Sequence, residues 1–183
     1  MSRKYASNSL DDQELDKLFC VVAKKWKLKR LLLKGMAICE SSLAEREYRY
    51  EPAFFRRYLA DKPEWKDQDP AIVSASYGLF QIMWTTAYWL GFRGTQEDLW
   101  NPVINTELAG KLLRKLLDEV IADTLCDKYF WLSPITIALA RYNGGNKANP
   151  DEHGNLRNQK YVNRVISEWE KLKLKEEECV NGD

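Results

Sequence analysis

The chain has 183 residues, which is the length of one domain. Hydrophobic residues make up 45% and charged residues 30%, so the composition is that of an ordinary globular protein and excludes a mainly disordered chain. Lys and Arg (28) nearly balance Asp and Glu (27), which argues against a nucleic-acid binder that works through a large basic surface.

Helical periodicity dominates the N-terminal part of the chain. Apolar residues between positions 11 and 34 recur at steps of three and four, with Ser9 or Asp11 as the cap. A second helix is predicted for about 29–43. This part of the chain is therefore predicted to be helical throughout.

In the rest of the chain, prolines and glycines mark where the predicted helices begin and end. Pro52 suits the first turn of a helix that ends near 61–63, and a polar loop is predicted for 67–75. Later segments are predicted as helices at about 79–90, 102–120, 135–139 and 161–174, and as a polar loop at 147–158. Gly144 and Gly145 stop the short apolar helix. Because little strand signal appears, the sequence predicts a mainly α fold.

The cysteines and histidine give no metal or nucleophile pattern. The four cysteines are far apart and form no CxxC pair; they are Cys20, Cys39, Cys126 and Cys179. A zinc framework needs closely spaced ligand pairs, and His153 is the only histidine, so we expect four independent thiols and no metal. A serine or cysteine nucleophile would have only His153 as its base.

Glu40 lies on the apolar face of its predicted helix. On a wheel of ~100° per residue it falls between Met36 and Leu33, with Ala37 beside it, whereas Lys34 marks the solvent face. A carboxylate among apolar neighbours loses hydration, which raises its pKa and suits a general acid. The alternative is a glutamate that is paired with a lysine or arginine, or exposed by a bend near the helix end.

Two further segments combine glycine with polar residues. Segment 77–83 (YGLFQIM) has a glycine at a predicted helix start and places Gln81 among apolar residues, where it needs polar partners such as a sugar amide or hydroxyl. Segment 141–145 (RYNGG) ends an apolar helix with a phenol, an amide and two glycines. Taken singly, the first is a polar residue in a core and the second is a helix C-cap.

Taken together and in this order, the three segments resemble the lytic transglycosylases of the soluble-lytic-transglycosylase (SLT) type, within the goose-lysozyme-like glycoside hydrolases. Members carry a catalytic Glu-Ser, then Gly-Leu-Met-Gln, then Ala-Tyr-Asn-Ala-Gly, and a Tyr-Val pair on the next helix. The corresponding residues here are Glu40-Ser41, Gly78-Leu79-Phe80-Gln81, Tyr142-Asn143-Gly144-Gly145 and Tyr161-Val162. The resemblance spans about 28–169, and it departs from the pattern at Phe80 and Gly144.

The resemblance implies a single mainly α, lysozyme-like domain. We expect residues 1–27 to form an N-terminal helix packed on the domain, 28–175 the catalytic domain, and 176–183 a solvated tail. The stretch between Glu40 and Gly78 is longer than is usual in the family. Its aromatic residues form either a wall or lid along a glycan groove or an extra helix on the core. They are Tyr48, Tyr50, Phe54, Phe55, Tyr58 and Trp65.

The resemblance also implies a reaction, namely cleavage of the β-1,4 bond between N-acetylmuramic acid and N-acetylglucosamine in peptidoglycan. Glu40 would protonate the leaving oxygen, and the 2-acetamido group of the substrate would stabilise C1. Glu40 would then take the proton of the muramic C6 hydroxyl, which attacks C1 and forms a 1,6-anhydro ring. No cofactor is implied. The substrate-binding residues carried over are Ser41, Tyr77, Gln81, Met83, Tyr142, Asn143 and Tyr161.

Two alternatives stay open at this point. A lysozyme- or chitinase-type hydrolase on the same fold needs a second carboxylate, ~6.5–9.5 Å from the first for inversion. Position alone offers Glu45, Glu47, Glu51 and Glu64. The other alternative is a non-catalytic glycan-binding or virion structural module, which has no need of a buried acid.

The expected partner is the peptidoglycan glycan strand, with no nucleic acid and with a monomer as the default state. The polar N-terminus predicts no signal peptide, and the longest apolar runs fall short of the ~20 residues of a membrane span. The sequence therefore suggests an endolysin-like phage enzyme that acts on the cell wall or in the periplasm. Holin-type lysis would release it, or a virion would carry it.

Overall fold

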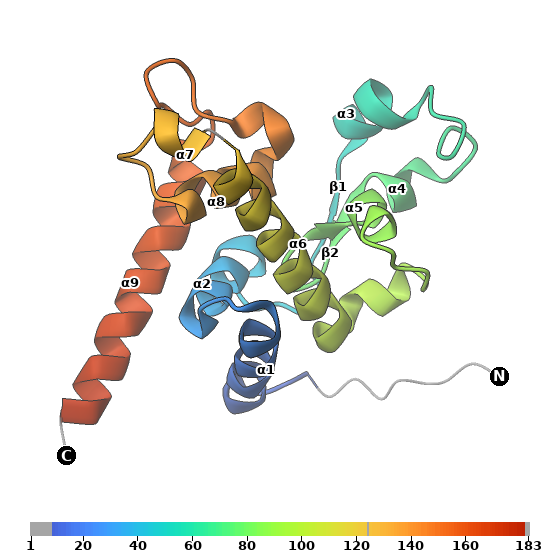
Figure 1. The fold of residues 1–183 in the computed structure, drawn as a ribbon. Coiled ribbons are helices and arrows are strands. Elements are labelled where there is room, and N and C mark those ends of the chain that lie inside the picture. Colours follow the sequence, from blue (N-terminus) through green and yellow to red (C-terminus); the bar gives the residue numbers. More distant parts are fainter. Residues whose placement is uncertain (1–8, 124, 182–183) are drawn as a thin grey trace.

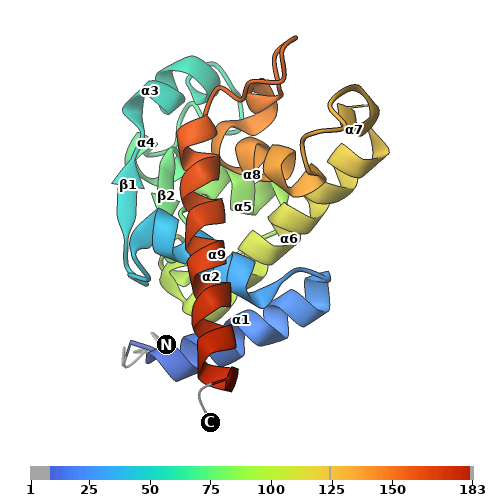
Figure 2. The same ribbon diagram turned by 90° about the vertical axis from the view of Figure 1, so that its left-hand side faces the viewer.

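Five longer helices form the scaffold of the chain (Figure 1), of which the computed structural model describes residues 9–123 and 125–181. They are α1 (Asp12–Trp26), α2 (Arg30–Ser41), α6 (Pro102–Ala122), α8 (Pro134–Gly144) and α9 (Gln159–Asn181). α2 packs against α9 and α1, and α6 packs against α8 and α1. Figure 2 shows α9 running along α2. The fold is mainly α, as the periodicity predicts.

Short elements fill the connections between these helices. The helical ones are α3 (Pro52–Phe54), the π-turn η1 (Phe55–Leu59), α4 (Pro70–Val73), α5 (Trp84–Trp89), α7 (Leu125–Lys128) and the 3₁₀ turns η2 (Glu97–Trp100) and η3 (Gly145–Ala148). Three strands, β1 (Tyr48–Tyr50), β2 (Ala75–Tyr77) and β3 (Ile82–Met83), form an antiparallel sheet in the order β1-β2-β3. Tyr48 lies opposite Tyr77, and Ser76 opposite Met83.

The sheet corrects the prediction of a helix over 79–90. The chain turns at Gly78, forms β3, and becomes helical only at Trp84. Gly78 therefore lies in a strand-to-strand turn and does not start a helix. Its φ of +73° and that of Gln81, +48°, are left-handed, which a helix does not allow. The predicted loop at 67–75 likewise contains α4 and the first residue of β2.

Helix ends differ from the predictions in two places. α1 stops at Trp26, because Lys27 adopts a left-handed φ of 52° and its N–H binds the carbonyls of Ala23 and Lys24. At the other end of α1, Asp11 is the cap and forms a capping box with Glu14. α9 continues past the predicted end at 174, up to Asn181.

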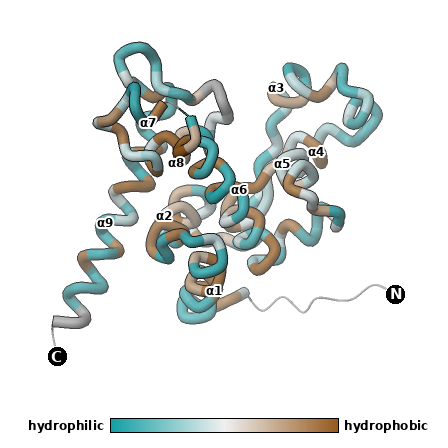
Figure 3. Tube along the Cα trace, in the orientation of Figure 1, coloured by the Kyte–Doolittle hydropathy of each residue, from teal (hydrophilic) through white to brown (hydrophobic). Residues whose placement is uncertain are grey.

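One main core joins the long helices, and a second, smaller core lies under the segment between β1 and β2. The main core includes Phe19, Leu33 and Met36, all fully buried. The smaller one consists of Leu59, Trp65 and Val73. In Figure 3 the tube of α9 alternates between teal and brown, as expected of a helix with one packed face.

Two of the predictions concern residues that lie partly outside the described ranges. Cys20 and Cys39 are free thiols, while the side chains of Cys126 and Cys179 lie outside the described part. Residues 1–8 and 182–183 of the predicted N-terminal and tail segments also lie outside it. Within 9–123 and 125–181, no helix has both the length and the apolar character that crossing a membrane requires.

Candidate active site

Glu40 stands in the last turn of α2, at a firmly held helix end. Ser42 ends the helix with a left-handed φ of 55°, and its N–H binds the carbonyls of Ala37 and Ile38. The buried hydroxyl of Ser41 donates to the carbonyl of Leu79, 2.9 Å away in the β2–β3 turn. The end of α2 is thus fixed to the sheet beside the carboxylate.

A tyrosine from the other end of the chain binds the Glu40 carboxylate. The Tyr161 hydroxyl, in the first turn of α9, donates to Oε1 of Glu40 at 2.7 Å. Burial raises the pKa of Glu40, whereas the Tyr161 hydrogen bond and the positive charges of Arg49 and Arg164 oppose the rise. The net effect is a raised pKa of Glu40. The carboxyl therefore stays protonated closer to neutral pH, as a general acid needs.

The two arginines that act on Glu40 bind other groups. Arg49 donates to the carboxylate of Glu51 at 2.8 Å, and Arg164 donates to the carbonyl of Cys39. Their charges therefore reach Glu40 through space, without a direct ion pair in the described residues. Sequence reasoning did not single out either arginine, because nothing in the local pattern places β1 or the second turn of α9 near position 40.

Two phenols face the carboxylate. Burial and the negative charge of Glu40 raise the pKa values of both Tyr142 and Tyr161. Both hydroxyls therefore stay protonated and act as donors. The Tyr142 hydroxyl donates to the carbonyl of Phe80 at 2.9 Å, which ties α8 to the β2–β3 turn.

Asn105 of α6 holds the β2–β3 turn, residues 78–81, through side-chain hydrogen bonds. Its side-chain amide donates to the carbonyls of Tyr77 (2.8 Å) and Leu99 (2.9 Å), and its oxygen accepts from the N–H of Phe80 (2.8 Å). A Cβ at Gly78 would lie 2.6 Å from the Asn105 amide nitrogen, so the turn requires glycine there. The sequence signal for Asn105 was an asparagine on the apolar face of the 102–120 helix, three residues before Leu108.

The site residues carried over from the family fall into two groups. Ser41, Tyr142 and Tyr161 gather around Glu40 and the turn, and Asn143 lies exposed at the end of α8. In contrast, Tyr77 is 1% exposed and its hydroxyl donates to the carbonyl of Ile72, so it has almost no surface to offer a sugar.

Gln81 and Met83 sit on the β2–β3 hairpin. The Gln81 amide donates to the carbonyl of Gly78 at 3.1 Å, and its oxygen accepts from the hydroxyl of Ser76 at 3.0 Å. Its polar partners thus come from its own hairpin, where a sugar was expected. Met83 is half-buried at the start of α5. Sugar contacts of both residues stay predictions.

The aromatic residues between Glu40 and Gly78 differ in their exposure. Trp65 is 4% exposed and belongs to the smaller core, against which Phe54 and Phe55 pack. Tyr48, Tyr50 and Tyr58 keep 41%, 42% and 38% of their surface exposed. The segment therefore has a packed side and an aromatic exposed side.

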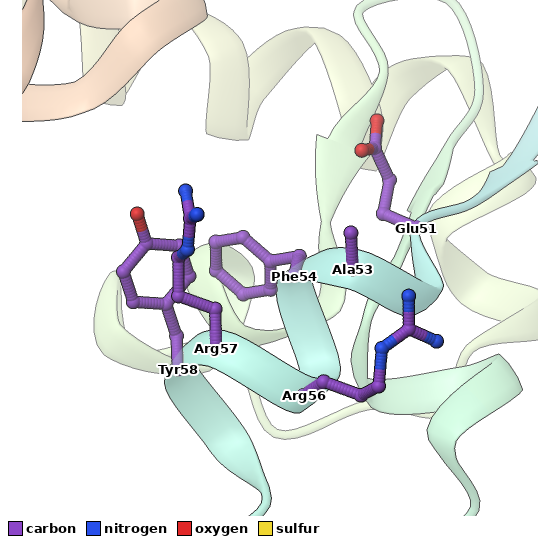
Figure 4. A pocket seen from close by; sticks show the side chains of 6 residues that line it. All are labelled: Glu51, Ala53, Phe54, Arg56, Arg57 and Tyr58. Atoms are coloured by element: carbon purple, nitrogen blue, oxygen red, sulfur yellow. The ribbon is translucent and has the colours of Figure 1, made fainter.

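The predicted second carboxylates lie in different surroundings. Glu45 accepts a hydrogen bond from the N–H of Leu10 at 2.7 Å, and Glu47 and Glu64 are exposed. Glu51 pairs with Arg49 and lines a shallow pocket of ≈ 560 Å³ on the segment after β1 (Figure 4). Glu51 thus lines a cavity next to its ion pair with Arg49.

Comparison with known families decides the identity of the fold. The family model described as Transglycosylase SLT domain matches residues 17–165, a range that contains Glu40 and the segments around Gly78 and Tyr142. The chain belongs to this family. No curated protein matches it. As an SLT domain it has the mainly α, lysozyme-like fold of lytic transglycosylases, enzymes that act on peptidoglycan.

Proposed function

We propose that this SLT domain cleaves the β-1,4 bond between N-acetylmuramic acid and N-acetylglucosamine and releases a 1,6-anhydromuramic acid end, with Glu40 as general acid and then general base. The observation that carries the proposal is the pair of Glu40 and Tyr161, 2.7 Å apart in surroundings that raise the pKa of the carboxyl. The Ser41 contact to Leu79 holds this carboxyl beside the hairpin.

The first step uses protonated Glu40. Its proton moves to the glycosidic oxygen as the C1–O bond breaks, and the carbonyl oxygen of the substrate 2-acetamido group stabilises the positive charge at C1. Tyr161 donates to Oε1 and so leaves Oε2 for the proton that is transferred. The hydrogen bond and the charges of Arg49 and Arg164 stabilise the carboxylate that remains.

The second step regenerates the acid. Carboxylate Glu40 takes the proton of the muramic C6 hydroxyl while O6 bonds to C1 and the acetamide oxygen withdraws. No water is consumed, and Glu40 ends protonated. Tyr142 and Asn143, at the end of α8, are the residues we place along the substrate groove, with Gln81 and Met83 on the hairpin side.

One observation favours hydrolysis as a second candidate. Glu51 faces the pocket, and its partner Arg49 lies close enough to lower the pKa of Glu40. In a hydrolase Glu51 would take the proton of a water molecule that attacks C1 from the opposite face. A transglycosylase has no such requirement.

Mass spectrometry of the products from purified peptidoglycan tests the proposal. We expect 1,6-anhydromuramic ends from the wild type, and a rate ~10²–10⁴-fold lower from Glu40→Gln, which keeps the shape of the side chain and removes the acid. Glu177→Gln, which alters an exposed glutamate of α9, is the matched control and should keep the wild-type rate.

Other outcomes identify the alternatives. Reducing ends, one water heavier, would overturn the transglycosylase reaction and make Glu51→Gln the next variant. A folded wild type that releases nothing from peptidoglycan or chitin oligomers would favour a glycan-binding or virion structural module. Loss of turbidity when the protein is added to permeabilised Gram-negative cells would support a lytic, endolysin-like role.

A further inference from the structure

The pocket on the segment after β1 is built from cationic and aromatic side chains. It has a volume of ≈ 560 Å³ and is lined by Glu51, Ala53, Phe54, Arg56, Arg57 and Tyr58. Figure 4 shows Phe54, Arg57 and Tyr58 at one end, while Glu51 and Arg56 lie toward the other. The rings of Phe54 and Tyr58 are 5.0 Å apart and give the pocket an apolar wall.

The segment that carries this pocket is held in place. Leu59 is 1% exposed and packs with Trp65 and Val73 in the smaller core. The N–H of Glu51 binds the carbonyl of Ser74 at 2.9 Å, at the start of the segment. The pocket residues are therefore presented by a packed unit, as precise recognition requires.

A π-turn shapes the cationic side of the pocket. Over Phe55–Leu59 the backbone is wider than an α-helix, with the N–H of Ala60 bonded to the carbonyl of Phe55 at 3.0 Å. Such turns occur frequently at functional sites. Here the turn contains Arg56, Arg57 and Tyr58, three of the lining residues.

The pocket has excess positive charge. Arg49 neutralises Glu51 at 2.8 Å. Arg56 and Arg57 are exposed, and neither forms an ion pair with any residue in the ranges that the structure describes. The guanidinium group is a planar fork that matches a carboxylate with two parallel hydrogen bonds. An anionic ligand, with a carboxylate as its best-fitting group, would complete this pocket.

Arg49 places the pocket beside the proposed catalytic carboxyl. Its charge lowers the pKa of Glu40, while its guanidinium binds Glu51, which lines the pocket. Arg49 therefore connects the pocket, through Glu51, with the surroundings of Glu40. The part of peptidoglycan that bears carboxylates next to muramic acid is its peptide stem.

We propose that Arg56 and Arg57 bind carboxylates of the peptide stem, with Phe54 and Tyr58 packing against its apolar atoms. The inference rests on the proposed function, because it takes peptidoglycan as the substrate. It makes the segment between β1 and β2 a specificity element that distinguishes strands with stems from bare glycan.

Binding to an inactive protein tests this proposal separately from catalysis. In the Glu40→Gln background, calorimetry compares the disaccharide of N-acetylglucosamine and N-acetylmuramic acid with and without a tripeptide stem. We expect the stem to strengthen binding, and the double change Arg56→Gln/Arg57→Gln to weaken binding of the stem-bearing ligand about tenfold. The effect should shrink at high salt, since the pocket is exposed.

The matched control removes two exposed lysines from α1, Lys17→Gln/Lys24→Gln, and should leave binding unchanged. Equal affinity for both ligands in the Glu40→Gln protein would overturn the inference. An equal loss with the stem-free ligand would also overturn it, because the arginines would then bind the disaccharide itself, including the lactyl carboxylate that is free when no stem is attached. Stem-dependent binding without anhydro products from the wild type would refute the proposed reaction and leave the peptide site standing.

Discussion

The hydrogen bond between Tyr161 and Glu40 links a neutral donor to a carboxyl that, in the proposed reaction, changes its charge in every cycle. Burial raises the pKa of Glu40, and the Tyr161 hydroxyl acts in the opposite direction because it stabilises the carboxylate. The pKa of Tyr161 is itself raised, so this donor is present over the whole working range of pH. The pair would therefore meet both needs of the proposed reaction, an acid in the first step and a stabilised base in the second.

Replacement of Tyr161 by phenylalanine should shift the pH profile. Without the donor the pKa of Glu40 rises further, so the alkaline limb of kcat/KM moves to higher pH. Because a hydrogen bond to a charged group is lost, we expect kcat/KM at the optimum to fall about tenfold. The measurement is the initial rate of anhydromuropeptide release from pH 4 to 9.

Tyr129→Phe is the control for this profile, since Tyr129 is also a buried tyrosine (2% exposed) but is absent from the contacts of Glu40. Its profile should coincide with that of the wild type. An alkaline limb of Tyr161→Phe that stayed in place, or moved to lower pH, would contradict the assigned direction.

At the scale of elements, the β2–β3 turn is the junction on which three helices meet. α2 reaches it through Ser41, α8 through Tyr142 and α6 through Asn105. Each contact is a side chain that binds a backbone group of the turn. The position of the hairpin relative to Glu40 is thus set by these polar contacts together with the burial of Leu79 and Phe80 in the main core.

Removal of the Asn105 side chain should loosen this junction. Asn105→Ala deletes three buried hydrogen bonds, each worth about 1 kcal/mol, so we expect a loss of about 3 kcal/mol in the free energy of unfolding. Urea unfolding followed by circular dichroism measures it. Asn163→Ala, at an exposed asparagine of α9, should change stability by less than ~0.5 kcal/mol. Equal effects of the two changes would show that the turn does not depend on Asn105.

Most of the helical scaffold could be predicted, because amphipathic helices of ten or more residues repeat their apolar pattern several times. The sheet could not, since its strands are two or three residues long and show no alternation. Gln81 illustrates the problem: a left-handed φ at a residue other than glycine carries no signal in a single sequence.

The same contrast holds for the candidate site. Glu40 stood out because a charged residue broke an apolar face, and Tyr161 came from the family resemblance. Arg49 and Arg164 were missed, because their approach to Glu40 depends on how β1 and α9 fold back onto α2. Tyr77 was placed in the site by its neighbours in the motif, yet all three residues of β2 are buried and the Tyr77 ring lies in the core.

At the scale of the whole molecule, α1 shares the main core. Its residues Leu15, Phe19 and Val22 are 4%, 0% and 3% exposed, and the Phe19 ring meets that of Phe80 edge-on at 5.9 Å. The family match also begins inside α1, at residue 17. We propose that 28–175 is the catalytic unit in function but that it needs residues 12–26 to fold.

Deletion of residues 1–27 tests this division. Burial of each large apolar side chain contributes ~1.5–3 kcal/mol, so loss of three of them approaches the whole stability of a typical domain. We expect the shortened chain to lose cooperative thermal unfolding and to bind hydrophobic dyes. Two single substitutions give a milder test. Phe19→Ala should lower the free energy of unfolding by ~3–5 kcal/mol, whereas Val21→Ala, at a residue that is 66% exposed, should lower it by less than ~0.5 kcal/mol. A shortened chain that melted at the wild-type temperature would contradict the proposal.

The contact between Glu40 and Tyr161 joins residues 121 positions apart. During translation Glu40 leaves the ribosome long before its partner exists, and the carboxyl gains its donor only after the start of α9 has been synthesised and has docked on α2. A nascent or truncated chain that stops short of α9 therefore contains Glu40 without the Tyr161 hydroxyl that lowers its pKa. Cleavage by a protease in the exposed stretch from Asp151 to His153 would break the covalent link between the two residues and leave only the packing of α9 on α2 to hold them together.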